Sequence, residues 1–232
     1  MQVTVEVFRY DPDTDESRFD TFIKEVDPKD RVLDVMMAIK DEDDGTIAFR
    51  KSCAHGVCGS CAMEINGLNR LACQVLIQDL KSKRIHIRPI KGMKVLRDLI
   101  VDMEAFFAGL EKVKPYFIPG EPAPAAEYHQ SVKDRAVFDE TTKCIMCGSC
   151  TTSCPSFRWF NREFVGPAAF VKAHRFIFDS RDGGNEERLG VLDDKNGLWR
   201  CHSIYNCTDA CPREIDITKA IGDLKRYTVI HR

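Results

Sequence analysis

Residues 53–73 read CAHGVCGSCAMEINGLNRLAC and hold four cysteines in the spacing C-x4-C-x2-C-x11-C. Gly56 and Gly59 stand between the first three cysteines, and glycine adopts backbone turns that other residues resist. The pair Asn66-Gly67 predicts a type I′ turn between two short strands. This stretch therefore predicts a glycine-rich loop around four thiols, closed by a β-hairpin.

The spacing of these four cysteines is that of a plant-type [2Fe–2S] site. Two irons bridged by two sulfides need four thiolates from several directions, which Cys53, Cys58, Cys61 and Cys73 can supply. The backbone N–H groups of the loop can point at the anionic sulfurs, as they do in other anion nests. A zinc site made of the same four thiolates is the alternative, and the asymmetric spacing disfavours it.

Two further groups of cysteines lie in the second half of the chain. Residues 144–155, CIMCGSCTTSCP, match the bacterial ferredoxin run C-x2-C-x2-C-x3-C-P without a gap. Residues 201–212, CHSIYNCTDACP, match the same run except at Ile204. In two-cluster ferredoxins the fourth cysteine of each run binds the other cluster. One site is therefore expected to bind [4Fe–4S] and the other, where isoleucine cannot hold a fourth iron, [3Fe–4S].

This crossing rule assigns every thiol of the two runs to one of the two clusters. The [4Fe–4S] cluster is assigned Cys144, Cys147, Cys150 and Cys211, and the [3Fe–4S] cluster Cys154, Cys201 and Cys207. All 11 cysteines of the chain then belong to one of three motifs, and an odd number cannot be fully paired as disulfides within one chain. The alternative at position 204 is an apolar residue beside a cluster completed by His202 or Asp209.

Composition excludes several other classes of protein. The 34 basic and 36 acidic residues nearly cancel, which does not suggest a nucleic-acid partner. No apolar run approaches ~18 residues, so we expect no membrane-spanning segment. No G-x-G-x-x-G after a strand and no P-loop is present. These observations favour an electron carrier in a reducing compartment, where cysteine-rich chains bind metal more often than they form disulfides.

The pattern of elements predicts an α+β chain of two domains. An N-terminal β-grasp domain of the plant-type ferredoxin kind is expected over 1–105 and an all-α, bacterial-ferredoxin-like domain over 106–232, with a proline-rich linker at about 114–131. Period-2 alternation predicts strands at 3–7, 21–26 and 84–90. Helical spacing predicts helices at 30–40 with Asp30 as cap, at 95–115, at 166–182 with Pro167 in the first turn, and at 216–227.

Three clusters in this order, with isoleucine in the interrupted run, resemble the iron–sulfur subunits of succinate dehydrogenase (respiratory complex II) and of its sister enzyme, quinol:fumarate reductase. The resemblance covers nearly the whole chain. Five segments carry it: SCAHGVCGSCAMEING, LRDLIVDM, KPYFIP, CIMCGSCTTSCPSF and RCHSIYNCTDACPREIDITKAI.

This resemblance implies an electron-transfer subunit. A flavoprotein subunit with covalent FAD would oxidise succinate to fumarate. Electrons would then pass through [2Fe–2S], [4Fe–4S] and [3Fe–4S] to a membrane quinone, bound with one or more membrane-anchor subunits that can hold haem b. The chain would sit on the cytoplasmic face of a prokaryotic inner membrane. Fumarate reductase, the same machine in reverse, and a free-standing soluble electron carrier are the alternatives.

By the same resemblance, Pro155, Trp159, His202 and Ile204 would line the quinone pocket. Trp159 offers an indole N–H to a quinone oxygen. Many relatives carry two adjacent tryptophans here, whereas this chain has Arg158 before Trp159. The alternatives are that Trp159 anchors the membrane subunit without touching quinone, and that His202 is a hydrogen-bonding residue of the fold.

Overall fold

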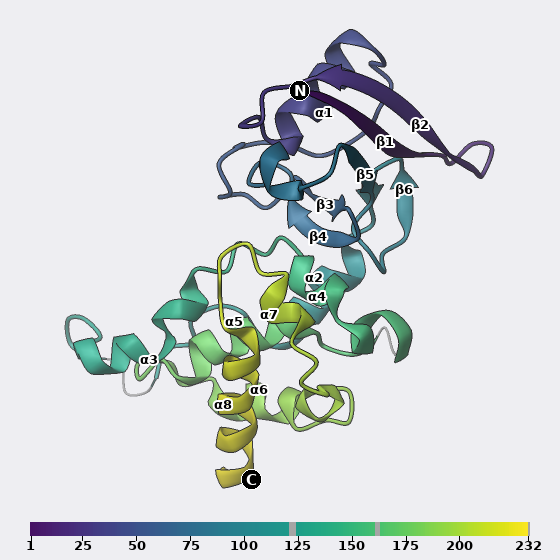
Figure 1. Ribbon diagram of the computed structural model, residues 1–232. Helices are drawn as coiled ribbons and strands as arrows, with labels where there is room; N and C mark the ends of the chain where they lie inside the picture. Colours follow the sequence, from purple (N-terminus) through teal and green to yellow (C-terminus); the bar gives the residue numbers. More distant parts are fainter. Residues whose placement is uncertain (121–123, 161–162, 232) are drawn as a thin grey trace. The chain divides into compact units, whose positions relative to one another are not determined.

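The computed structural model describes residues 1–120, 124–160 and 163–231, and the chain divides into two compact units (Figure 1). Unit 1 comprises Met1–Met103 and Ile145–Ser153, and unit 2 comprises Glu104–Cys144 and Cys154–Arg232. In the described part of the chain, no helix has the length and apolar character to cross a membrane.

Unit 1 is built on a five-stranded sheet with strand order β2-β1-β5-β3-β4. β1 pairs in parallel with β5, and the β1–β2, β3–β5 and β3–β4 pairs are antiparallel. The bounds are β1 Gln2–Asp11, β2 Glu16–Glu25, β3 Ala62–Ile65, β4 Leu68–Leu71 and β5 Arg84–Arg88. The alternating valines of β1, Val3, Val5 and Val7, are buried in the core, as period-2 spacing predicts.

Helix α1, Val32–Glu42, contributes Val35, Met36 and Ile39 to the same core, so the expected β-grasp arrangement of sheet and helix is confirmed. The expected cap is wrong. Arg31, not Asp30, occupies the N-cap position, and Asp34 at N3 accepts a hydrogen bond from the Arg31 backbone N–H. Asp30 instead accepts from the backbone N–H of Asp27, because it belongs to the preceding turn.

The single helix expected over 95–115 is also wrong. Residues Val95–Arg97 and Ile100–Val101 form a small β-hairpin, β6 and β7, and helix α2 spans only Glu104–Lys112. Asp98 lies between the two strands at φ 46°, which no α-helix contains. Its buried carboxylate accepts hydrogen bonds from the Arg9 side chain and from the backbone N–H groups of Tyr10 and Ala48. Bonds to distant parts of the chain thus override the local helical spacing.

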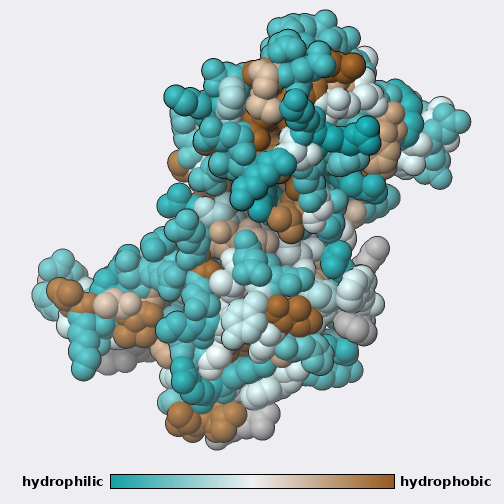
Figure 2. Space-filling model, in the orientation of Figure 1, coloured by the Kyte–Doolittle hydropathy of each residue, from teal (hydrophilic) through white to brown (hydrophobic). Residues whose placement is uncertain are grey.

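Unit 2 is helical, as expected. Besides α2 it holds α3 Val132–Thr142, α5 Pro167–Ile177, α6 Asn185–Leu192, α7 Asn206–Asp209 and α8 Ile217–Ile230, with short turns of helix at Ser156–Phe160 (η2) and Leu198–Arg200 (η3). Pro167 lies in the first turn of α5, and Asp216 caps α8 by accepting from the Lys219 N–H. Exposed apolar surface is visible over α3 and at the end of α8 (Figure 2). Val132 and Ile230 are among the exposed apolar residues of these two helices.

The described part of the expected linker is bound to unit 2. Arg188 of α6 donates to the backbone carbonyls of Val113, Lys114 and Tyr116, and the Gly120 N–H donates to the carbonyl of Arg181. Residues 121–123 of the expected linker lie outside the described residues.

Candidate iron–sulfur sites

The loop between α1 and β3 carries the first three cysteines of unit 1, and the fourth follows β4. The β3–β4 turn has φ 47° at Asn66 and φ 84° at Gly67, so the predicted type I′ hairpin is confirmed. The hairpin brings the chain back, and the backbone N–H of Ala72 donates to the carbonyl of Cys61. Cys73 and Cys61 are therefore positioned at one end of this hairpin.

Backbone N–H groups of this loop surround the first thiol. The Sγ atom of Cys53 accepts from the N–H groups of His55 at 3.4 Å, Val57 at 3.3 Å and Cys58 at 3.3 Å. The Sγ atom of Cys73 accepts from the N–H of Gly56 at 3.3 Å. Such bonds stabilise negative charge on sulfur, and the expectation that the loop amides would point at the thiols is confirmed.

Hydrogen bonding and burial shift the pKa values of two thiols of this loop in opposite directions. The hydroxyl of Ser60 lies 3.1 Å from the Sγ atom of Cys58 and, together with neighbouring N–H groups, lowers the pKa of that thiol. Burial raises the pKa of Cys61. A thiol that coordinates a metal is deprotonated, so iron would supply the positive charge that a buried thiolate needs. The four sulfurs and their donors therefore fit a [2Fe–2S] cluster.

Gly59 is packed closely against the backbone of Cys147. Its φ is 74°, and an added Cβ would lie 2.7 Å from the Cβ and 2.9 Å from the Cα of Cys147. Gly59→Ala is expected to lower iron by about two atoms per chain and abolish the [2Fe–2S] EPR signal, because the loop must shift. Gly67→Ala is the matched control, since Gly67 has φ 84° but open space around it. Equal iron content in both variants would contradict this role of the close approach.

The three thiols assigned to the [3Fe–4S] cluster line one pocket of unit 2. Cys154 precedes η2, Cys201 follows η3 and Cys207 lies in α7, and all three face the same cavity. The hydroxyl of Ser156 donates to the carbonyl of Arg200 at 2.9 Å and so ties the first segment to the second. The sequence runs that the spacing paired are therefore brought together around one space.

Burial raises the pKa of Cys154, and it raises the pKa of Cys207 to about 11. Two polar groups of helix α8 contact the residues of this pocket. The hydroxyl of Thr218 lies 3.9 Å from the Sγ atom of Cys207, and the Nζ atom of Lys225 donates to the carbonyl of Cys201 at 2.9 Å. Three thiols, of which Cys207 is buried and the other two are half-buried, fit an anionic iron–sulfur cluster beside this ammonium group.

Three of the four residues expected at a quinone line the same pocket. Pro155, His202 and Ile204 are part of its wall, whereas Trp159 is not. The Trp159 side chain is 69% exposed, with the guanidinium of Arg158 5.0 Å from its ring centroid. Ile204 is 50% exposed, so its side chain reaches both the pocket and the surface.

The four thiols assigned to the [4Fe–4S] cluster belong to different units. Cys147 and Cys150 lie in unit 1, beside and within α4 (Ser149–Ser153), and Cys144 and Cys211 lie in unit 2. The carbonyl of Cys144 accepts a hydrogen bond from Lys172 of α5 at 3.4 Å.

None of the 11 cysteines, all of which lie within the described residues, forms a disulfide. Within residues 1–120, 124–160 and 163–231, no three His, Cys, Asp or Glu side chains converge closely enough to hold a single metal ion. One Zn²⁺ gathers its thiolates about 2.3 Å from a common centre. An iron–sulfur cluster distributes its thiolates over several irons.

Reasoning from the sequence missed the residues that support the thiols. Ser60 stands between two cysteines and was open to inference, because a hydroxyl there is within reach of sulfur. Arg31 and Lys225 donate hydrogen bonds to backbone carbonyls 23 and 24 residues away, and no local sequence pattern predicts such contacts.

Comparison with known proteins covers both units. Residues 4–108 match the family described as 2Fe-2S iron-sulfur cluster binding domain, and residues 140–215 match the 4Fe-4S dicluster domain. A curated relative from Paracoccus denitrificans, the succinate dehydrogenase iron-sulfur subunit, is 44% identical over 225 residues, which are 96% of this chain and 86% of that protein.

Two solved structures resemble the chain. One, described as the Mycobacterium smegmatis Sdh1 complex in the apo form, superposes with a TM-score of 0.91 at 27% identity, covering 100% of this chain and 97% of the other. A hypothetical protein from Helicobacter pylori shares the fold at a TM-score of 0.61 and 15% identity, covering 97% of this chain and 39% of the other.

Proposed function

Because the chain belongs to the family of succinate dehydrogenase iron–sulfur subunits, the oxidoreductase components of complex II, we propose that it carries electrons from succinate to a membrane quinone through three clusters. The pocket of unit 2 is the observation that supports this proposal most strongly. Among the residues that the structure describes, three thiols and no fourth line this pocket, together with residues suited to an apolar ligand.

The clusters take the ligands that the cysteine spacing assigns. Cys53, Cys58, Cys61 and Cys73 hold [2Fe–2S], and the hydrogen bonds to their sulfurs support this assignment. Cys154, Cys201 and Cys207 hold [3Fe–4S], and their shared pocket supports it. Cys144, Cys147, Cys150 and Cys211 hold [4Fe–4S], an assignment that rests on the unbroken run and the crossing rule.

The quinone binds at the [3Fe–4S] end, against Pro155, His202 and Ile204. The imidazole of His202 can donate or accept a hydrogen bond at a quinone carbonyl, while Pro155 and Ile204 supply apolar surface. Trp159 lies outside this wall and is largely exposed, so it contacts quinone or the membrane-anchor subunit from the surface. The quinone is the electron acceptor, and the protein groups orient it and exclude water.

The partners follow from the family. A flavoprotein subunit with covalent FAD oxidises succinate and delivers electrons to [2Fe–2S]. One or more membrane-anchor subunits, with or without haem b, complete the quinone site and hold this chain at the cytoplasmic face of a prokaryotic inner membrane. The cofactors carry the redox chemistry, and this chain sets their spacing and surroundings.

Elemental analysis of the purified complex tests the cluster content. About nine irons and about ten acid-labile sulfides per chain are expected, the sum over the three clusters. Faster succinate:quinone than fumarate:quinol turnover supports the succinate dehydrogenase direction, and the reverse ratio supports fumarate reductase. Recovery of the native chain as a monomer without a flavoprotein would support a free-standing carrier, and a colourless holoprotein would support zinc.

A further inference from the structure

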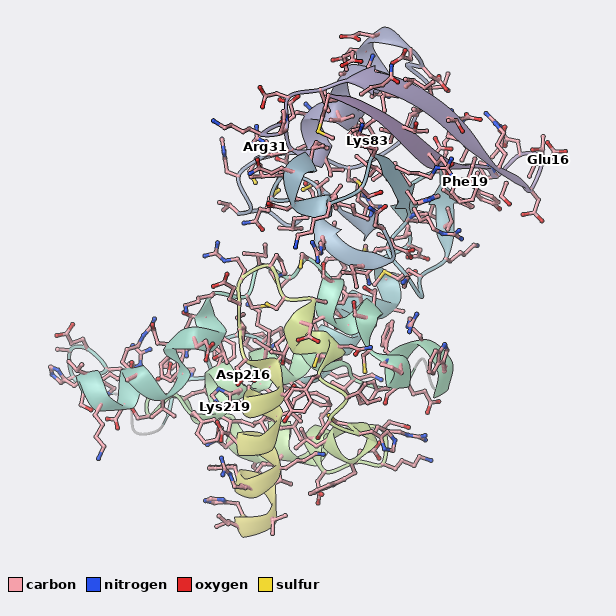
Figure 3. All side chains as sticks on the ribbon, in the orientation of Figure 1. Glu16, Phe19, Arg31, Lys83, Asp216 and Lys219 are labelled. Atoms are coloured by element: carbon pink, nitrogen blue, oxygen red, sulfur yellow. The ribbon has the colours of Figure 1, made fainter. Side chains whose placement is uncertain are left out.

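Arg31 joins the start of helix α1 to the loop that carries Cys53. Its Nε and Nη2 atoms donate to the two carboxylate oxygens of Asp34 at 2.8 and 3.1 Å. Its Nη1 atom donates to the backbone carbonyl of Ala54 at 2.8 Å. Arg31 lies in unit 1, at the start of helix α1 (Figure 3). The fork to Asp34 holds the guanidinium in one orientation, which leaves Nη1 for the loop.

The carbonyl that Arg31 holds belongs to a strained turn. Ala54 has φ 57°, in the left-handed region that residues with a Cβ rarely adopt. A residue in that region persists only when its surroundings hold it there. The Ala54 carbonyl accepts a hydrogen bond from the charged guanidinium of Arg31, so Arg31 opposes relaxation of the turn.

The same peptide unit serves the cluster on its other side. A peptide group is planar and trans, so the carbonyl of Ala54 and the N–H of His55 point in opposite directions. The carbonyl faces Arg31, and the His55 N–H donates to the Sγ atom of Cys53 at 3.4 Å. Fixing the carbonyl therefore aims the N–H at the sulfur. The next N–H, that of Gly56, donates to the Sγ atom of Cys73 at 3.3 Å.

We propose that Arg31 is a positioning residue for the [2Fe–2S] cluster: held by Asp34, it fixes the Ala54–His55 peptide so that loop amides reach the thiolates of Cys53 and Cys73. The proposal rests on the ligand set assigned above. Its effect is on loop geometry and on hydrogen bonding to sulfur, because the adjacent Asp34 carboxylate largely cancels the charge of the guanidinium. Outer partners of this kind orient ligands and set the potential of a metal centre.

Arg31→Met in the intact complex tests this role. Loss of the [2Fe–2S] EPR signal under a ferrous chelator and a reductant is expected to become about tenfold faster, the effect of losing one charge-assisted hydrogen bond. The midpoint potential of [2Fe–2S] is expected to fall, because fewer amides stabilise the reduced, more negative cluster. The signals of the other two clusters should not change. Arg31→Lys, which keeps one donor, should restore part of both losses.

Arg18→Met is the matched control. Arg18 makes the same two-pronged contact with Asp20, at 2.8 and 3.2 Å, on strand β2 of the same unit. Arg31→Met values that equal those of Arg18→Met would overturn the proposal. If Arg31→Met does not assemble, Asp34→Asn is the second variant, because it keeps the guanidinium but removes the carboxylate that holds it. An unchanged [2Fe–2S] potential in Asp34→Asn would also overturn the proposal. A wild-type complex without any [2Fe–2S] signal would refute the ligand assignment instead.

Discussion

Replacing Ile204 with cysteine is expected to turn the [3Fe–4S] cluster into a [4Fe–4S] cluster and to slow quinone reduction about tenfold. Position 204 lies on the wall of the pocket that Cys154, Cys201 and Cys207 share. A thiol there completes the run C-x2-C-x2-C-x3-C and supplies the ligand that a fourth iron needs. A drop of 59 mV in the potential of the new cluster suffices for a tenfold shift in a one-electron equilibrium.

EPR spectroscopy of the oxidised complex measures the conversion, together with a gain of about one iron per chain. Succinate oxidation by an artificial acceptor that takes electrons at the flavin should not change. Ile204→Val is the control, because it keeps an apolar side chain that cannot bind iron. A [3Fe–4S] signal that survives Ile204→Cys unaltered would show that position 204 is not the open corner and would return attention to His202 and Asp209.

The elements that the sequence predicts well are those whose determinants are local. The alternation of Val3, Val5 and Val7 fixes one buried face of β1. Asn66-Gly67 fixes a turn because both residues adopt positive φ. Cysteine spacing works for a related reason, since a short loop around a cluster must place its thiols at fixed intervals.

The errors lie where distant residues decide the conformation. Residues 95–103 have helical spacing, yet the chain forms a hairpin there because Asp98 binds groups some 88 residues earlier in the chain, on β1. Arg31 occupies the N-cap position of α1, and its side chain donates to Asp34 and to a loop 23 residues away. Local patterns contain none of these contacts, so distant supports such as Arg31 are identified only in the folded chain.

Replacing Arg188 with methionine is expected to lower the free energy of unfolding by about 3–5 kcal/mol, because one partner of a buried ion pair is lost. The side chains of Arg188 and Asp182 are both 0% exposed. Arg188 donates to Asp182, and its Nη2 atom also donates to the carbonyl of Tyr116 at 2.8 Å. The variant leaves Asp182 without its buried cation. It also removes the hydrogen bonds from Arg188 of α6 to the backbone carbonyls of Val113 and Lys114.

Chemical unfolding followed by circular dichroism measures this loss, with Arg135→Met as the control. Arg135 pairs with Asp139 on α3, but both side chains are exposed, and such pairs contribute little to stability. The double variant Arg188→Met/Asp182→Leu should recover part of the loss, since removing both partners of a buried pair leaves no unpaired charge. If Arg188→Met unfolds at the same denaturant concentration as Arg135→Met, the buried pair does not stabilise unit 2. In that case the carbonyls of residues 113–116 are satisfied without it.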